Sequence, residues 1–357
     1  MLRPRTIAPL GLALALAACA PVGSGSGGAS DSPGTSSTGQ APSPAASSTP
    51  VAATSSSATS AGFDITAFDV PAGSHPHDVA PATDGGVWYT GQHVGTLGHL
   101  DPATGTIRET PLGPGSSPHG VIVGPDGAPW VTDGGQNAIV RVDPKTSEVK
   151  VFTLPGPNVN LNTAAFDSTG ILWFTGQSGY YGRLDPKSGD LNVMKSPRGA
   201  GPYGITSTPD GRIFYASLAN SHIAWIDTKE GTAFPIDPPT RGQGARRVWS
   251  DSKSQIWVSE WSAGQLGFFS AHTDQWREWK LPGTDPMAYA VYVDESDIVW
   301  LTDFGANAIV RFDPRTETFT SYPHAQPNAA VRQLLGRPGE VWGAMSGQDK
   351  LLLIRTR

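Results

Sequence analysis

The sequence of 357 residues has one cysteine, Cys19, so an intramolecular disulfide is excluded. Its lysines and arginines form no cluster, and the formal net charge of −6 argues against a nucleic-acid partner. No Walker, Rossmann or zinc-finger spacing occurs, and no segment beyond the N-terminus has the periodicity of an amphipathic helix. Short strands separated by turns are therefore the main structural signal.

The first 19 residues are typical of an export signal. Arg3 and Arg5 precede a short apolar run that ends in Leu16-Ala17-Ala18-Cys19, which resembles the bacterial lipobox. The alternative is an ordinary secretory peptide with an incidental cysteine. We predict that 1–19 is a signal peptide and that lipid on Cys19 anchors an extracytoplasmic protein to the cell membrane, facing outward, without spanning the bilayer.

A linker is expected next. Residues 20–61 are mainly Ala, Ser, Gly, Pro and Thr, with one charge at Asp31 and no aromatic side chain. Such a segment has too little apolar surface to offset the entropy of ordering, so we predict that it is disordered. The folded part is then 62–357, which we expect to be a monomer.

An aromatic residue recurs through the folded part at spacings of 41–43 residues. These anchor residues are Trp88, Trp130, Trp173, Phe214, Trp257, Trp300 and Trp342. Each repeat contains four short β-type runs separated by turn residues, and the anchor lies in one of these runs. A period of about 40–45 residues with four strands per unit is typical of a β-propeller blade. The sequence therefore predicts an all-β, seven-bladed propeller.

The N-terminal end of the folded part has one strand too many for its repeat, and the last repeat has one strand too few. Residues 63–70 alternate like the fourth strand of a blade, whereas the last repeat stops after its third strand at 351–355. A strand at 63–70 beside 351–355 would complete the seventh blade and remove its open edges.

The start of each first strand and the end of each second strand should meet at one mouth of the channel, because the two strands run antiparallel. The first set is His77, His119, Asn162, Tyr203, Arg246, Tyr289 and Val331. The second set is Gly91, Asp133, Gly176, Ser217, Glu260, Asp303 and Met345. Because these positions are polar and vary between repeats, they favour a site for a small-molecule or peptide ligand in the channel. The alternative is that any propeller has a wet, polar mouth.

The repeat resembles the virginiamycin B lyase (streptogramin lyase) family. The segments that carry the resemblance are Pro118-His119-Gly120, Trp130-Val131-Thr132-Asp133, Asn137-Ala138-Ile139-Val140-Arg141 and Trp300-Leu301-Thr302-Asp303. It implies a propeller that linearises cyclic depsipeptide antibiotics by elimination. In that family a histidine removes a proton alpha to a carbonyl, and a magnesium ion held by two carboxylates stabilises the enolate-like charge.

The resemblance implies a pair of catalytic histidines in adjacent blades, which His77 and His119 match. Asp133 follows His119 by 14 residues, where the family has a carboxylate, but Ser117 stands where the family has another. In end-to-end register the family's histidines fall near Tyr289 and Val331-Arg332, so the match requires rotation of the ring by several blades.

We therefore predict His119 as the base, oriented by Asp133, and His77 as the residue that holds the substrate carbonyl. The predicted substrate-binding residues are Arg246, Tyr289, Tyr203 and Asn162. The predicted Mg²⁺ ligands are Asp133, Glu260 and Asp303. The alternative function is a non-catalytic surface propeller that binds a peptide, a glycan or a partner protein in the channel mouth.

Overall fold

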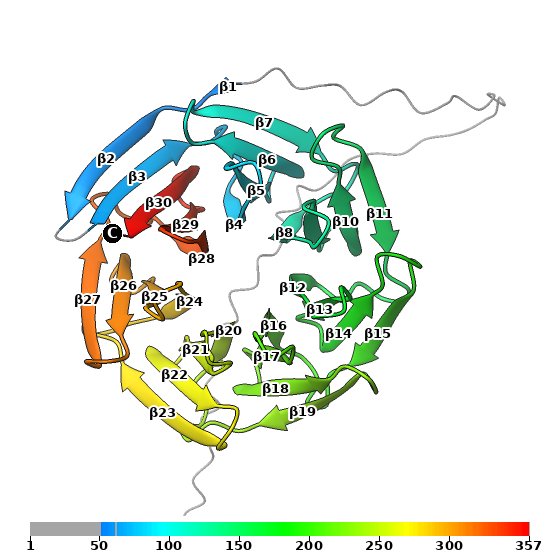
Figure 1. Cartoon of the computed structure of the whole chain (residues 1–357), viewed down its shortest axis with the longest axis vertical. Coiled ribbons are helices and arrows are strands. Elements are labelled where there is room, and N and C mark those ends of the chain that lie inside the picture. Colours follow the sequence, from blue (N-terminus) through cyan, green and yellow to red (C-terminus); the bar gives the residue numbers. More distant parts are fainter. Residues whose placement is uncertain (1–50, 61–62, 357) are drawn as a thin grey trace, which may run out of the picture. The chain divides into compact units, whose positions relative to one another are not determined.

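The computed structural model describes residues 51–60 and 63–356, which form seven antiparallel sheets arranged around a central channel (Figure 1). The predicted seven-bladed β-propeller is confirmed. None of the described residues belongs to a helix that could cross a membrane. The predicted signal peptide, Cys19 and the linker up to residue 50 lie outside the described residues.

Each blade runs from a first strand at the channel to a fourth strand at the rim. Blades 1 to 3 are β4(Pro76–Pro81), β5(Val87–Gly91), β6(Thr96–Asp101), β7(Thr106–Pro111); β8(Pro118–Val123), β9(Pro129–Asp133), β10(Ala138–Val142), β11(Val149–Thr153); and β12(Leu161–Phe166), β13(Leu172–Gly176), β14(Tyr180–Leu184), β15(Leu191–Lys195). Blades 4 and 5 are β16(Pro202–Ser207), β17(Ile213–Ser217), β18(His222–Asp227), β19(Thr232–Ile236); and β20(Ala245–Ser250), β21(Ile256–Glu260), β22(Gln265–Ser270), β23(Gln275–Lys280). Blades 6 and 7 are β24(Ala288–Val293), β25(Val299–Asp303), β26(Ala308–Asp313), β27(Thr318–Pro323); and β28(Val331–Arg337), β29(Glu340–Met345), β30(Lys350–Thr356), β3(Phe63–Asp69).

The two ends of the folded part close the ring as predicted. β3 pairs antiparallel with β30, in a register that runs from Phe63 opposite Thr356 to Asp69 opposite Lys350. Phe63 and Phe68 lie on opposite faces of β3 and both are buried, Phe63 against Trp300 of blade 6 and Phe68 stacked on Trp342 of blade 7. β3 therefore serves as the fourth strand of blade 7.

The boundary of the predicted linker is wrong at its C-terminal end. Residues 51–60 fall within it, yet they form β1(Val51–Ala52) and β2(Ser55–Ser60). β1 pairs with β7 at the rim of blade 1, and β2 pairs with β3 at the rim of blade 7. Pairing with exposed strand edges needs backbone groups rather than apolar side chains, so composition did not reveal it.

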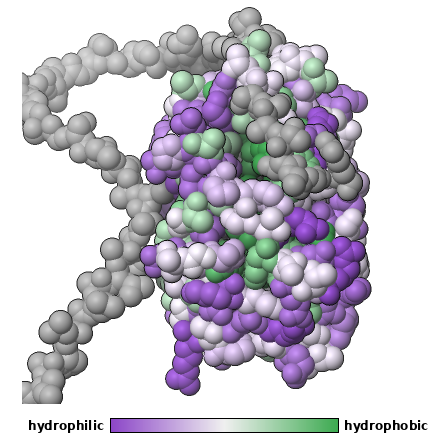
Figure 2. All heavy atoms as spheres, turned by 90° about the vertical axis from the view of Figure 1, so that its left-hand side faces the viewer, coloured by the Kyte–Doolittle hydropathy of each residue, from purple (hydrophilic) through white to green (hydrophobic). Residues whose placement is uncertain are grey.

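The aromatic anchors are buried between neighbouring blades. Trp300 is 1% exposed and packs in one cluster with residues of blades 6 and 7. Its indole N–H donates to Asp294 Oδ2 at 2.8 Å, and the turn carboxylates Asp126, Asp167 and Asp251 accept from their own blades' anchors in the same way. The outer wall that bears β27 is largely hydrophilic, with hydrophobic residues showing mainly in recesses (Figure 2). The repeated tryptophan is thus the packing unit of the ring.

Candidate functional site

The first strand of every blade carries a β-bulge at its start. In blade 1, for example, the register with β5 shifts between Pro76 and Val79. A bulge leaves extra residues unpaired and re-aims their side chains. Two successive residues of each blade therefore point into the channel and form two stacked rings.

The outer of these rings, called here the mouth ring, gathers most of the predicted site residues. Its members are His77, His119, Asn162, Tyr203, Arg246, Tyr289 and Arg332. The second ring, called the inner ring, consists of Asp78, Gly120, Thr163, Gly204, Arg247, Ala290 and Gln333.

One predicted mouth position is wrong. Val331 is 3% exposed and pairs with Met345, as Ala288 pairs with Asp303 in blade 6, so it precedes the bulge. Trp342 follows its β28 partner Leu335 by seven residues, whereas Trp300 follows its β24 partner Tyr292 by eight, so counting back eleven residues from Trp342 overshoots by one. The mouth residue of blade 7 is Arg332.

In five of the seven blades, the residue two after the anchor is a threonine or serine whose hydroxyl accepts from a backbone N–H of the bulge. Blades 4 and 7 have Ala216 and Ala344 at this position. In blade 1, Thr90 Oγ1 accepts from the Asp78 backbone N–H at 3.0 Å and donates to the His119 carbonyl of blade 2 at 2.9 Å. Ser259 likewise joins the Arg247 N–H of blade 5 to the Tyr289 carbonyl of blade 6. The backbone of the site is thereby fixed across blade boundaries.

His77, Asp78 and His119 lie together at the channel. Asp78 Oδ1 is 2.8 Å from His77 Nδ1, and the centroids of the two imidazole rings are 3.7 Å apart. Because a carboxylate accepts, His77 Nδ1 carries the proton and its Nε2 keeps a lone pair. Burial, followed by the charges of Arg332 and Arg247, holds the pKa of His77 well below its ordinary value, so the ring is neutral at pH 7.

His119 has the same tautomer as His77, but its Nε2 rather than its Nδ1 makes the hydrogen bond. The Asn162 amide nitrogen is 3.2 Å from His119 Nε2, and an amide nitrogen donates but does not accept. His119 Nε2 is therefore the acceptor and Nδ1 carries the proton. That buried Nδ1 has no hydrogen-bond partner among the described residues. Burial and then His77 lower the pKa of His119 well below its ordinary value. His77 Nε2 is thus available as a proton acceptor, and His119 Nδ1–H is available as a donor.

Asp133 does not orient His119, contrary to the prediction. Its carboxylate accepts from Ser116 Oγ, the Ser117 backbone N–H and the Gln136 backbone N–H. It thereby caps the loop that leads into β8 and the turn between β9 and β10. The carboxylate that does contact a site histidine is Asp78, which the sequence analysis did not single out.

Aromatic rings surround Arg246 in the mouth ring. Its Nη2 donates to Tyr203 Oη at 2.9 Å, and its guanidinium lies 3.7 Å from the Tyr289 ring centroid and 4.7 Å from that of Trp261. The hydroxyls of Tyr203 and Tyr289 are 2.8 Å apart. The predicted substrate-binding residues Arg246, Tyr203 and Tyr289 therefore form one contacting group, with His119 next to Tyr203.

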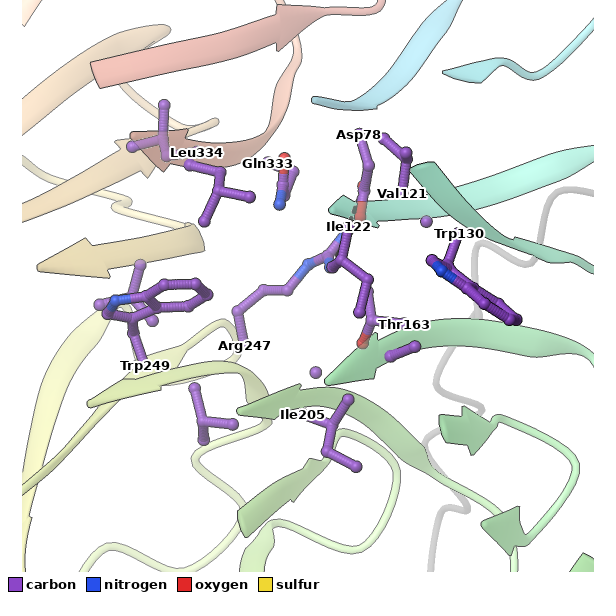
Figure 3. Close-up of a pocket in the computed structure, with 16 residues that line it drawn as sticks. Asp78, Val121, Ile122, Trp130, Thr163, Ile205, Arg247, Trp249, Gln333 and Leu334 are labelled. Carbon is purple, nitrogen blue, oxygen red and sulfur yellow. Dashed lines mark hydrogen bonds and ion pairs between the residues drawn. The ribbon is translucent and has the colours of Figure 1, made fainter. Parts of the chain in front are cut away.

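An ion pair in the inner ring separates the mouth from a second opening. Arg247 reaches across the channel to Asp78 with two hydrogen bonds of 2.8 and 3.2 Å (Figure 3). Beyond the pair lies a small pocket with Trp130, Trp249 and Leu334 in its wall. No mouth-ring residue lines this pocket. The site chemistry is therefore confined to the mouth side.

The residues predicted to bind magnesium do not form a shared site. Asp303 Oδ1 accepts three backbone N–H groups, from Met287, Gly305 and Ala306, and so caps its loop as Asp133 does. Within the described residues, one group of three potential ligands has its ligand atoms within 4.8 Å of one another, namely His77, Asp78 and His119. Imidazoles are poor ligands for a hard cation, and Arg247 already holds the one carboxylate of that group, so it does not fit Mg²⁺.

Glu260, the third predicted ligand, is fully buried, and neither carboxylate oxygen has a hydrogen-bond partner among the described residues. Burial, assisted by the charge of Glu278, raises its pKa to about 9. At pH 7 it is a neutral acid and a weak ligand for a cation.

The stability of the protein should therefore depend on the ionisation of Glu260. Its folded-state pKa of about 9 exceeds the ordinary value of 4.5, so the folded state holds the proton between these values while the unfolded state has lost it. The contribution of Glu260 to stability falls as pH rises through this window. We expect Glu260→Gln, which cannot ionise, to melt higher than the parent protein, by a margin that grows from about pH 5 to about pH 9. Glu148→Gln, at an exposed position, is the control, and an equal margin at both pH values would contradict the assignment.

Tyr289 should titrate unusually early. Burial alone would raise its pKa, but Arg246, Arg332 and Arg247 together lower it to about 8. Burial raises the pKa of its partner Tyr203. We expect a phenolate absorption step near pH 8 that is lost in Tyr289→Phe. A step that survives in that variant would assign it to another tyrosine.

Many solved structures are similar to this fold, among them three structures of lyases. A streptogramin B lyase matches with a TM-score of 0.77 and 23% identity, covering 83% of this chain and 99% of its own. Virginiamycin B lyase from Staphylococcus aureus matches with a TM-score of 0.77 and 22% identity, covering 82% and 99%. A catalytically inactive variant of that lyase with quinupristin gives the same values. At such identities the likeness establishes the fold alone.

No curated protein has significant sequence similarity to this chain. A family model does match it. The model of the virginiamycin B lyase family aligns with residues 40–283, which is more than half of the sequence and includes blades 1 to 5. The chain therefore belongs to the virginiamycin B lyase family.

Proposed function

We propose that this protein is an exported, lipid-anchored lyase that opens a carbon–oxygen bond of a cyclic ester by elimination. The observation that carries the proposal is the contact between His77 and Asp78 beside the His119 ring. It supplies a neutral, oriented base and a separate proton donor on one side of the channel.

In the proposed reaction His77 Nε2 removes the proton alpha to the substrate carbonyl. The electron pair of that C–H bond forms the new carbon–carbon double bond, and the bond from the beta carbon to the ester oxygen breaks. The oxygen leaves with that bond's electrons as a carboxylate, or takes the proton from His119 Nδ1 as a carboxylic acid. No water is added, so the product has the mass of the substrate.

Each histidine is held for its own role. Asp78 accepts from His77 Nδ1 and so keeps the lone pair on Nε2, while Arg247 pairs with the buried Asp78 carboxylate through two hydrogen bonds. Asn162 fixes the tautomer of His119. The roles are thus the reverse of those predicted for His119 and His77, because the carboxylate lies beside His77.

The test is incubation of the purified full-length protein with a panel of streptogramin B antibiotics, read by mass spectrometry. The expected result is a linear product of unchanged mass, formed with Mg²⁺ and with EDTA. A product heavier by one water would indicate hydrolysis and contradict the proposal. Ligand binding without any product would instead support the alternative of a non-catalytic surface propeller.

A further inference from the structure

We propose that the channel mouth recognises an anionic oxygen group of its ligand, a carboxylate or a phosphate, directly through Arg246 and Arg332. The inference rests on the proposed function in one respect, since it names the ligand class of the same site. Direct contact with the two arginines would replace the magnesium ion that the family resemblance places between protein and substrate.

Arg246 has no acidic partner in the part of the chain that the structure describes. Its hydrogen-bond acceptor is the Tyr203 hydroxyl, the rings of Tyr289 and Trp261 cover its guanidinium, and its buried Nε has no acceptor among the described residues. Stacking holds a guanidinium in place but satisfies few of its five N–H donors. The side chain is therefore oriented while part of its donor set remains available.

Arg332 is the second arginine of the mouth ring, two blades from Arg246. It forms no ion pair with a described carboxylate, and its buried Nε also lacks an acceptor. The bulge at the start of β28 places Arg332 in the mouth ring with His77, His119 and Tyr289, and its charge lowers the pKa of each of them. The catalytic histidines thus share the mouth with an uncompensated cation.

The charges of the two rings do not balance. Arg246, Arg247 and Arg332 contribute three positive charges, and Asp78 contributes one negative charge that Arg247 engages. With both histidines neutral, two positive charges remain at pH 7. Uncompensated charges in a partly buried site are costly, and a bound anion would remove that cost. The same charges repel a metal cation, which agrees with the absence of a magnesium ligand set among the described residues.

The position of these arginines also suits an elimination. A carboxylate or carbonyl oxygen that faces Arg246 and Arg332 would gain negative charge as the alpha proton leaves. Guanidinium groups aimed at that oxygen stabilise the developing charge without a metal ion. The arginines would then perform the task that the family resemblance assigned to magnesium.

The experiment is isothermal titration of the purified full-length protein with succinate, inorganic phosphate and the uncharged analogue succinamide, at constant ionic strength and with EDTA. At least one anion is expected to bind and succinamide is not. A higher affinity for succinate would indicate a carboxylate site, and a higher affinity for phosphate would indicate a phosphate site. Arg246→Gln and Arg332→Gln should each weaken the affinity by about tenfold or more, the loss of a charge-assisted hydrogen bond.

Arg108→Gln, on the exposed face of β7, is the matched control and should bind like the parent protein. The inference is overturned if neither anion binds, if succinamide binds equally well, if both mouth variants keep full affinity, or if binding requires Mg²⁺. His77→Ala separates the two proposals, because it should lose turnover and keep anion binding. In the parent protein, by contrast, absent turnover with intact anion binding would remove the proposed function alone.

Discussion

Alanine in place of His77 should lower the rate of elimination by about two to four orders of magnitude, the usual contribution of a positioned general base. The imidazole Nε2 is the acceptor for the substrate proton, and alanine leaves only solvent to take it. Turnover of the cyclic ester by the parent and variant proteins, followed by mass spectrometry, measures the effect.

Two further variants test the division of roles. His119→Ala removes the donor to the leaving oxygen and should also abolish most turnover, whereas the melting temperature should change by only a few degrees. His272→Ala is the control, because His272 is exposed and contacts the Lys253 carbonyl on an outer loop. If His77→Ala kept full activity while His119→Ala lost it, His119 would be the base after all.

Truncation of an anchor tryptophan should have the largest effect on stability. We expect Trp300→Ala to lower the free energy of unfolding by about 3–5 kcal/mol, because a large cavity would remain between blades 6 and 7 and Asp294 would lose its indole donor. Trp130→Ala should behave similarly at its own blade boundary. Denaturant unfolding of the purified variants is the measurement.

Phe234→Ala is the matched control for the anchors. Phe234 is 47% exposed on the outer strand of blade 4, so its loss should cost less than about 1 kcal/mol. Equal destabilisation by Phe234→Ala and Trp300→Ala would mean that the repeated anchors are not the packing unit of the ring.

The repeat made the architecture predictable. An anchor every 41–43 residues determines the blade count, and the missing strand of the last repeat identifies β3 as its completion. The same counting placed six of the seven mouth-ring residues correctly, since the spacing from anchor to bulge is constant in those blades. It placed Val331 in the mouth only because Trp342 lies one residue closer to its β28 partner than Trp300 lies to its β24 partner.

Charge pairing was less predictable. Asp78 and Arg247 are 169 residues apart in sequence and meet only because blades 1 and 5 face each other across the channel. Asp133 and Asp303 look like channel carboxylates in sequence, but backbone N–H groups of neighbouring loops bind them. A strand pattern does not show where a bulge turns a second residue inward, so the inner ring was not anticipated.

The sequence by itself determined the seven blades, the closure of the ring and the types of side chain at its mouth, because these depend on local periodicity repeated along the chain. Only the tertiary structure decided which groups pair. It joined His77 to Asp78 and Arg247, assigned Asp133 and Asp303 to loop capping, and left Arg246 and Arg332 without acidic partners among the described residues. Pairing depends on distances across the channel, which arise from ring geometry and from the bulges rather than from any one repeat.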